Sequence, residues 1–171
     1  ALARVVPGGQ TYRSEQGTVY QPGISDQTVG ASSIFLGRVT LPPLERTRAH
    51  MHEHHESAFF VLSGSDIEPW SGELLENCAT AKQGDYLFIP RDVPHVAVNR
   101  NATQPAVFVG VRNDPTAQES GVLRPGLDAC VPREGVNEPT MTAHPAQTAP
   151  LGVADARRSP SYGRALRPDR G

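Results

Sequence analysis

Apolar residues along this chain recur with the two-residue period of β-strands rather than with the period of a helix. The stretch SSIFLGRVTLPP (residues 32–43) alternates in this way at Ile34, Leu36, Val39 and Leu41 and ends at two prolines. Further strands are expected where short apolar runs recur, at residues 58–62, 86–89, 96–98 and 106–111, with a weaker run at 18–20. Residues 71–82 come nearest to a helical period, and one short helical turn is expected there at most.

Turn-forming residues separate these runs. SGS at 63–65, QGD at 83–85 and NRN at 99–101 are typical of reversals between strands. Many short strands at this spacing predict an all-β sandwich or barrel, and the 16 glycines and 16 prolines fit such a turn-rich fold.

Length and charge narrow the function classes. The chain has 171 residues, enough for one domain with a full core, and its net charge of −2 does not suggest a partner that is a nucleic acid. No apolar run is long enough for a signal peptide or a membrane span, so we expect a cytoplasmic protein with no membrane partner. Cys78 and Cys130 are expected to be reduced thiols.

Composition divides the chain into three parts. Residues 1–27 form a polar, glycine-rich N-terminal arm, residues 28–128 hold the predicted strands, and residues 129–171 form an irregular C-terminal tail rich in proline and arginine. The tail is expected either to be flexible or to wrap a partner subunit. Because the arm and the apolar strand at 34–41 exceed what a minimal barrel needs, we hypothesise a homodimer in which the arm adds strands across the interface.

The heptad HMHEHHE at residues 50–56 contains four histidines and two glutamates. His50 and His52 are two apart, so on a strand their side chains share one face. Glu56 follows, and His95 begins another predicted strand directly after Pro94. Imidazole and carboxylate together suit first-row divalent metals, although such a heptad alone is also compatible with a solvated loop or adventitious metal binding.

The residues around these histidines resemble two motifs of the cupin superfamily. The first motif, Gly-x5-His-x-His-x3 or x4-Glu-x6-Gly, is matched by Leu44, His50, His52, Glu56 and Gly64, with leucine in place of the first glycine and one extra residue before the last. The chain is most similar to single-domain, RmlC-like cupins, which often carry HHE before a strand like FFVLSG and a segment like DPTAQES.

The second motif, Gly-x5-Pro-x-Gly-x2-His-x3-Asn, is matched by Gly84, Pro90, Asp92, His95 and Asn99. Only Asp92 departs from it, and aspartate tolerates the left-handed backbone that the glycine would adopt. The resemblance covers about residues 28–123 and implies a double-stranded β-helix, the jelly-roll barrel of the cupins.

The resemblance implies one divalent transition metal, held by His50, His52, Glu56 and His95, with iron, manganese, nickel, copper and zinc left open. Counting back from Gly64 places the carboxylate position on Ser57 instead of Glu56. Either a bulge turns Glu56 inward or the site uses only histidines, with His54 or His55 completing it. Neutral imidazoles bind metal, so occupancy is expected to fall as the pH drops through about 6.5.

Three function classes follow. The first is a metal-dependent small-molecule enzyme with dioxygenase, isomerase, cyclase, decarboxylase or lyase chemistry, an oxidoreductase being slightly favoured. The alternatives are a non-catalytic, metal-dependent small-molecule binding protein and a structural role for the metal. The pattern identifies no catalytic residue and no organic cofactor. Arg112 is a candidate for contacting an anionic substrate. Core or pocket-wall positions are expected for the aromatic residues Phe60, Trp70, Tyr86, Phe88 and Phe108.

Overall fold

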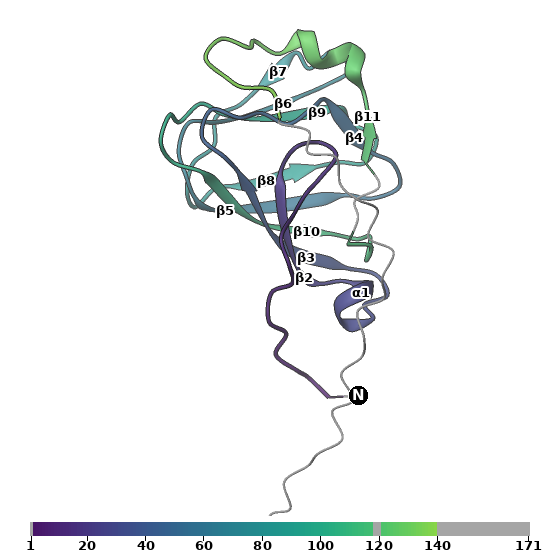
Figure 1. Ribbon diagram of the computed structural model, residues 1–171. Helices are drawn as coiled ribbons and strands as arrows, with labels where there is room; N and C mark the ends of the chain where they lie inside the picture. Colours follow the sequence, from purple (N-terminus) through teal and green to yellow (C-terminus); the bar gives the residue numbers. More distant parts are fainter. Residues whose placement is uncertain (1, 118–120, 140–171) are drawn as a thin grey trace, which may run out of the picture.

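The computed structural model describes residues 2–117 and 121–139, which fold into two facing antiparallel sheets (Figure 1). The larger sheet has six strands in the order β1-β2-β3-β10-β5-β8. Its strands are β1 (Tyr12–Arg13), β2 (Val19–Ile24), β3 (Phe35–Leu41), β5 (Ser57–Ser63), β8 (Tyr86–Ile89) and β10 (Ala106–Arg112). This mostly-β, two-sheet architecture confirms the predicted fold class.

The smaller sheet has five strands in the order β11-β4-β9-β6-β7. Its strands are β4 (His50–His52), β6 (Ile67–Ser71), β7 (Asn77–Cys78), β9 (His95–Asn99) and β11 (Gly121–Leu123). After β3 the chain alternates between the two sheets, except at the β6–β7 hairpin within the smaller sheet, so it winds around one shared interior, as in a double-stranded β-helix.

The strands expected from the apolar pattern coincide with β3, β5, β8, β9 and β10. The helical turn expected within residues 71–82 is absent; this stretch holds a turn and the two-residue strand β7. The described helices are α1 (Asp26–Val29), which Ser25 caps with its side chain, and the 3-10 helix η1 (Pro125–Cys130). No helix in the described part of the chain has the length and apolarity that crossing a membrane requires.

The N-terminal segment pairs within its own chain. Strand β2 lies antiparallel to β3, with Tyr20 opposite Val39, and β1 folds back onto β2. Residues 12–24 therefore extend the six-stranded sheet of their own chain.

Two apolar cores flank the five-stranded sheet. The larger lies between the sheets and includes Phe35, Leu41, Val61, Ile67 and Phe108. The second lies on the other side of the smaller sheet, where outward-facing side chains of β9 meet the C-terminal segment. Its buried members are Ala49, Leu75, Val96, Val98 and Val131. Figure 1 shows the C-terminal segment crossing this outer side.

The packed chain continues past residue 128, where the tail was expected to begin, because Val131 has 0% exposure. Arg46, also 0% exposed, donates to the carbonyl oxygen of Val131 at 3.2 Å and lies 3.5 Å from the Asp128 carboxylate. Arg100 donates to the carbonyl oxygens of Pro132 and Glu134. The other part of the predicted tail, residues 140–171, lies outside the described residues.

Four turns carry the glycine positions of the two motifs, and all four have positive φ. Gly64 (φ 117°) and Gly84 (φ 94°) keep the glycine, and at Gly64 a Cβ would lie 3.0 Å from the Cα of Ala106. Leu44 (φ 53°) and Asp92 (φ 62°) adopt the left-handed backbone although neither is a glycine. The turn geometry is thus kept at both positions where the chain departs from the motif.

We predict that Asp128→Ala lowers the free energy of unfolding by about 3 kcal/mol, measured by urea denaturation. The carboxylate accepts the N–H of Ala49 at 2.7 Å and faces the buried Arg46, so its loss leaves the Ala49 donor without its acceptor and Arg46 with carbonyl partners but no counter-charge from Asp128. Asp128→Asn is the control: it keeps an acceptor for Ala49 and should cost less. Equal, small losses in both variants would contradict this account.

Candidate metal centre

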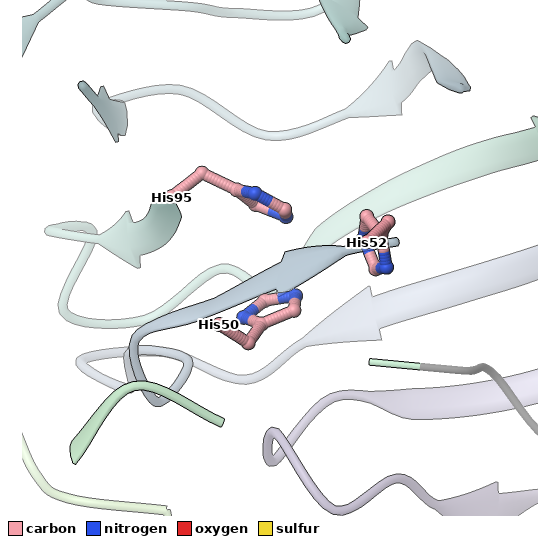
Figure 2. Close-up of side chains that lie close together, drawn as sticks. All are labelled: His50, His52 and His95. Atoms are coloured by element: carbon pink, nitrogen blue, oxygen red, sulfur yellow. The ribbon is translucent and has the colours of Figure 1, made fainter. Parts of the chain in front are cut away.

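Three histidines converge inside the barrel (Figure 2). His50 and His52 extend from β4 and His95 from the start of β9, and all three side chains are buried. The ring centroids of His50 and His95 are 4.2 Å apart, and those of His52 and His95 are 4.8 Å apart. One ring nitrogen from each residue lies within 4.8 Å of the others.

Strand register brings these rings together. His50 and His52 point to the same side of β4 because side chains alternate along a strand. His95 lies directly opposite His50 in the antiparallel pairing of β4 with β9. A shift of one residue in this pairing would turn His95 to the outer face.

Backbone carbonyls fix the orientation of two of the imidazoles. Nδ1 of His50 donates to the carbonyl oxygen of Arg48 at 2.8 Å, and Nδ1 of His95 donates to that of Val93 at 2.9 Å. Because a carbonyl only accepts, the proton of the neutral ring is on Nδ1 and the Nε2 lone pair is available to a metal. Metal-ligating histidines commonly have such an outer partner.

Burial keeps all three rings neutral. It lowers the pKa of His95 to about 4, against the contrary effect of the hydrogen bond to Val93. Burial and the adjacent His95 lower the pKa of His50 well below its ordinary value. Burial, followed by the neighbouring His95 and His50, lowers the pKa of His52 as well. Protons are therefore expected to compete with a metal only well below the value of about 6.5 that the sequence suggested.

These residues fit a divalent transition metal. Two nitrogens bound at about 2.1 Å to one tetrahedral ion are about 3.4 Å apart, so small rotations of the rings would bring the three nitrogens to bonding distance. Three neutral imidazoles leave coordination positions for other ligands. The donor set suits zinc, copper, iron and nickel better than magnesium or calcium, which prefer oxygen.

Glu56, the fourth residue expected to bind the metal, lies outside this group. Its side chain is exposed, and its backbone N–H donates to the side-chain oxygen of Asn113. Ser57, the position reached by counting back from Gly64, has the buried side chain instead.

The two remaining histidines of the heptad differ from each other. His54 is exposed and has a positive φ of 73°. His55 is buried, with its ring centroid 4.6 Å from that of His52 and its Nδ1 3.7 Å from the carboxylate of Asp114. His55 therefore lies beside the three-histidine group, on the side of His52.

The histidines form one wall of a cavity of about 470 Å³, a size typical of small-molecule sites. Inward-facing residues of both sheets line it, among them Leu41, Phe59 and Phe108. Gln16 and Thr18, which the sequence analysis assigned to the N-terminal arm, also line this cavity. No local pattern in the sequence marks them, because their position depends on how the arm folds over the barrel.

Arg112 does not reach this cavity. Its guanidinium lies 3.8 Å from the centroid of the Phe35 ring and donates to the carbonyl oxygens of Thr116 and Ala117. Because the charge of Arg112 also lowers the pKa of His52, the expectation that Arg112 contacts an anionic substrate stays a prediction.

The aromatic residues singled out in the sequence fall into two groups. Phe108 belongs to the inner core, and Trp70 packs against the outer core. Tyr86 and Phe88 are 81% and 64% exposed, and the rings of Phe60 and Tyr86 are tilted against each other with centroids 4.9 Å apart. These three residues face outward from the six-stranded sheet, but Tyr86 and Phe88, like Trp70 and Phe108, also line the cavity, as expected for pocket-wall residues.

Comparison with solved structures gives matches in which the sequence identity is low and the fold is shared. The polyketide cyclase RemF from Streptomyces resistomycificus has a TM-score of 0.55 at 22% identity, covering 78% of this chain and 96% of its own. A conserved protein with a double-stranded β-helix domain from Klebsiella pneumoniae has a TM-score of 0.52 at 19% identity, covering 66% and 83%. An oxalate decarboxylase has a TM-score of 0.55 at 19% identity, covering 67% of this chain and 30% of its own.

No curated protein matches the chain. The family model described as the cupin domain matches residues 37–112, which include the three converging histidines and both motifs. Together with the two-sheet architecture, this match establishes that the chain contains a domain of the cupin superfamily.

Proposed function

We propose that this protein is a metal-dependent small-molecule enzyme whose metal is held by His50, His52 and His95. The observation that carries the proposal is the position of three buried, neutral imidazoles on the wall of a cavity large enough for a small molecule. A structural metal site is usually closed by four protein ligands, whereas these three histidines adjoin open space.

Each part of the site has a distinct role in this proposal. A bound divalent metal would supply a Lewis acid that polarises an oxygen of the substrate. The carbonyls of Arg48 and Val93 hold the rings of His50 and His95 with Nε2 available. The apolar walls exclude water and orient the body of the substrate, which strengthens electrostatic interactions at the histidines. Oxidoreductase chemistry is the reaction class that we favour for the first activity screen.

We predict that His95→Ala protein, purified without a histidine tag, contains less than about a tenth of an equivalent of metal by elemental analysis, whereas the wild type contains about one. His95 is the only member of the group from outside the heptad, so no adjacent histidine substitutes for it. His50→Ala and His52→Ala should lose less metal, since His55 lies beside His52.

The matched control is His54→Ala, which removes an exposed histidine of the same heptad and should leave the metal content unchanged. Glu56→Gln tests the fourth ligand: because Glu56 is exposed, this variant should also keep its metal. Stoichiometric metal in His95→Ala would overturn the proposed site. If the metal-loaded protein binds small molecules tightly but converts none of them, the result would favour the non-catalytic alternative.

We predict that the zinc affinity changes by less than about twofold between pH 7.5 and 5.5, because burial holds the histidine pKa values low, that of His95 at about 4. Three exposed histidines with a pKa of about 6.5 would lose about a thousandfold over the same range. A peptide of residues 48–56 serves as the exposed reference, and competition with a chromophoric chelator measures both. A thousandfold loss in the protein would contradict neutral, buried ligands.

The lowered histidine pKa values also predict that the folded protein loses stability in acid. Below about pH 6.5 the unfolded chain binds protons at histidines that stay neutral in the folded state. Stability is therefore present above that pH and is lost as the pH falls toward about 4, the folded-state pKa of His95. We expect the metal-free protein to show this loss in thermal unfolding scans.

We also propose that the protein is a homodimer. Four exposed apolar side chains, Leu36, Val111, Ala58 and Phe88, lie in register across β3, β10, β5 and β8 on the outer face of the larger sheet. Apolar surface that is contiguous in this way usually marks an interaction site, and a two-fold pairing of one face with itself is the commonest solution. Because β2 already pairs with β3 of its own chain and β1 with β2, we place the interface on this face.

We predict that Phe88→Glu shifts the protein from dimer to monomer at micromolar concentration in light scattering. The matched control is Leu74→Glu, which places the same charge on an exposed leucine of the turn before β7 and should leave the dimer intact. A wild type that is monomeric would refute the dimer directly.

A further inference from the structure

The cavity beside the histidines contains no formal charge. None of its lining residues in the described part of the chain is an aspartate, glutamate, lysine or arginine. Its polar side chains other than the histidines are uncharged, and they include Gln16, Thr18, Ser71 and Asn77. The remaining wall is mainly apolar and includes Phe59 and Phe108, whose ring centroids are 6.1 Å apart in an edge-to-face arrangement.

The arginines nearest to this wall have partners elsewhere. Arg46 extends into the outer core, where it meets Asp128. Arg100 pairs with Glu68 at 3.0 Å on the same outer side. Arg112 stacks on Phe35 and donates to backbone carbonyls, while its buried Nε has no hydrogen-bond partner among the described residues and its charge lowers the pKa of His52. None of these three arginines lines the cavity.

This distribution of charge restricts the ligand. An anionic phosphate or a second carboxylate in the body of a ligand would leave water without a counter-charge on the cavity wall, which is strongly unfavourable. A flat apolar body would instead replace water against Phe59 and Phe108. The group that would meet a metal at the histidines has a different requirement. Three neutral imidazoles do not neutralise a divalent ion, so oxygen donors that carry negative charge are favoured there.

We propose that the site takes an uncharged, largely apolar or aromatic small molecule with one chelating oxygen group, such as a β-diketone. Phosphorylated sugars, nucleotides and dicarboxylates are excluded as substrates. This inference rests on the proposed function for the position of the chelating group, whereas the charge selection belongs to the cavity itself.

The test compares 1-phenyl-1,3-butanedione with its analogue that carries a carboxylate on the phenyl ring, using isothermal titration calorimetry. The two probes share the chelating group and differ in the charge of the body. We expect the carboxylated probe to bind at least tenfold more weakly, both to metal-free protein and to zinc-loaded protein. Equal or tighter binding of the carboxylated probe in either form would overturn the inference, as would no binding of the neutral probe to both forms.

A cavity-filling variant locates the binding. Ala97 faces the interior from β9 and lines the cavity, so Ala97→Phe should weaken binding of the neutral probe at least tenfold with zinc content unchanged. Ala102→Phe, at an exposed loop position, is the matched control and should bind normally. A folded Ala97→Phe protein that binds the probe like the wild type would overturn the assignment to this cavity. If Ala97→Phe does not fold, the comparison of the two probes on the wild type decides.

The zinc stoichiometry, measured without any probe, separates this inference from the proposed function. Metal-free protein that prefers the neutral probe but never takes up zinc would refute the metal centre and support the charge selection. Stoichiometric zinc together with a preference for the carboxylated probe would support the metal centre and refute the charge selection.

Discussion

The antiparallel pairing of β4 with β9 is the constraint on which the functional site depends. It places His50 opposite His95, and the alternation of side chains along β4 adds His52 to the same interior face. Both strands lie inside the five-stranded sheet, with neighbours on each side, so their register is held by pairing in both directions. The three imidazoles therefore lie on the interior face of the sheet, where they are buried. Burial lowers the pKa values of these rings and keeps them in the neutral form that binds metals.

Polar and charged groups are separated by the two faces of the smaller sheet. Toward the inside, this sheet presents histidines and small or uncharged side chains. Toward the outside, its valines meet Val131. Arg46 binds the Asp128 carboxylate and the Val131 carbonyl, and Arg100 binds the carbonyls of Pro132 and Glu134. The segment that follows β11 thus covers the outer face and engages these cations, while the cavity remains uncharged.

Departures from the cupin motifs show how the fold tolerates substitution. Leu44 and Asp92 stand where glycine is usual, yet both keep a left-handed backbone, so the turns depend on the surrounding structure as well as on the residue. The departure at the carboxylate position has a different consequence. With one extra residue before Gly64, Ser57 is buried and Glu56 is exposed, so Glu56 lies outside the histidine group while the strand that follows is formed as usual.

The amino-acid sequence by itself determined the local features of this protein. Alternating apolar residues marked most of the long strands, turn residues separated them, and the spacing of His50, His52 and His95 within two motifs identified the metal-ligand candidates. These features were predictable because alternation and turn preferences depend on neighbours within a few residues.

Only the tertiary structure decided that Gln16 and Thr18 line the cavity, that Glu56 lies outside the histidine group, and that no arginine of the described residues lines the cavity. It also decided that the histidine pKa values are low. The physical reason is that register between distant strands, the direction of a loop residue, and the loss of hydration all arise from contacts between segments far apart in the chain, for which one sequence contains no local signal.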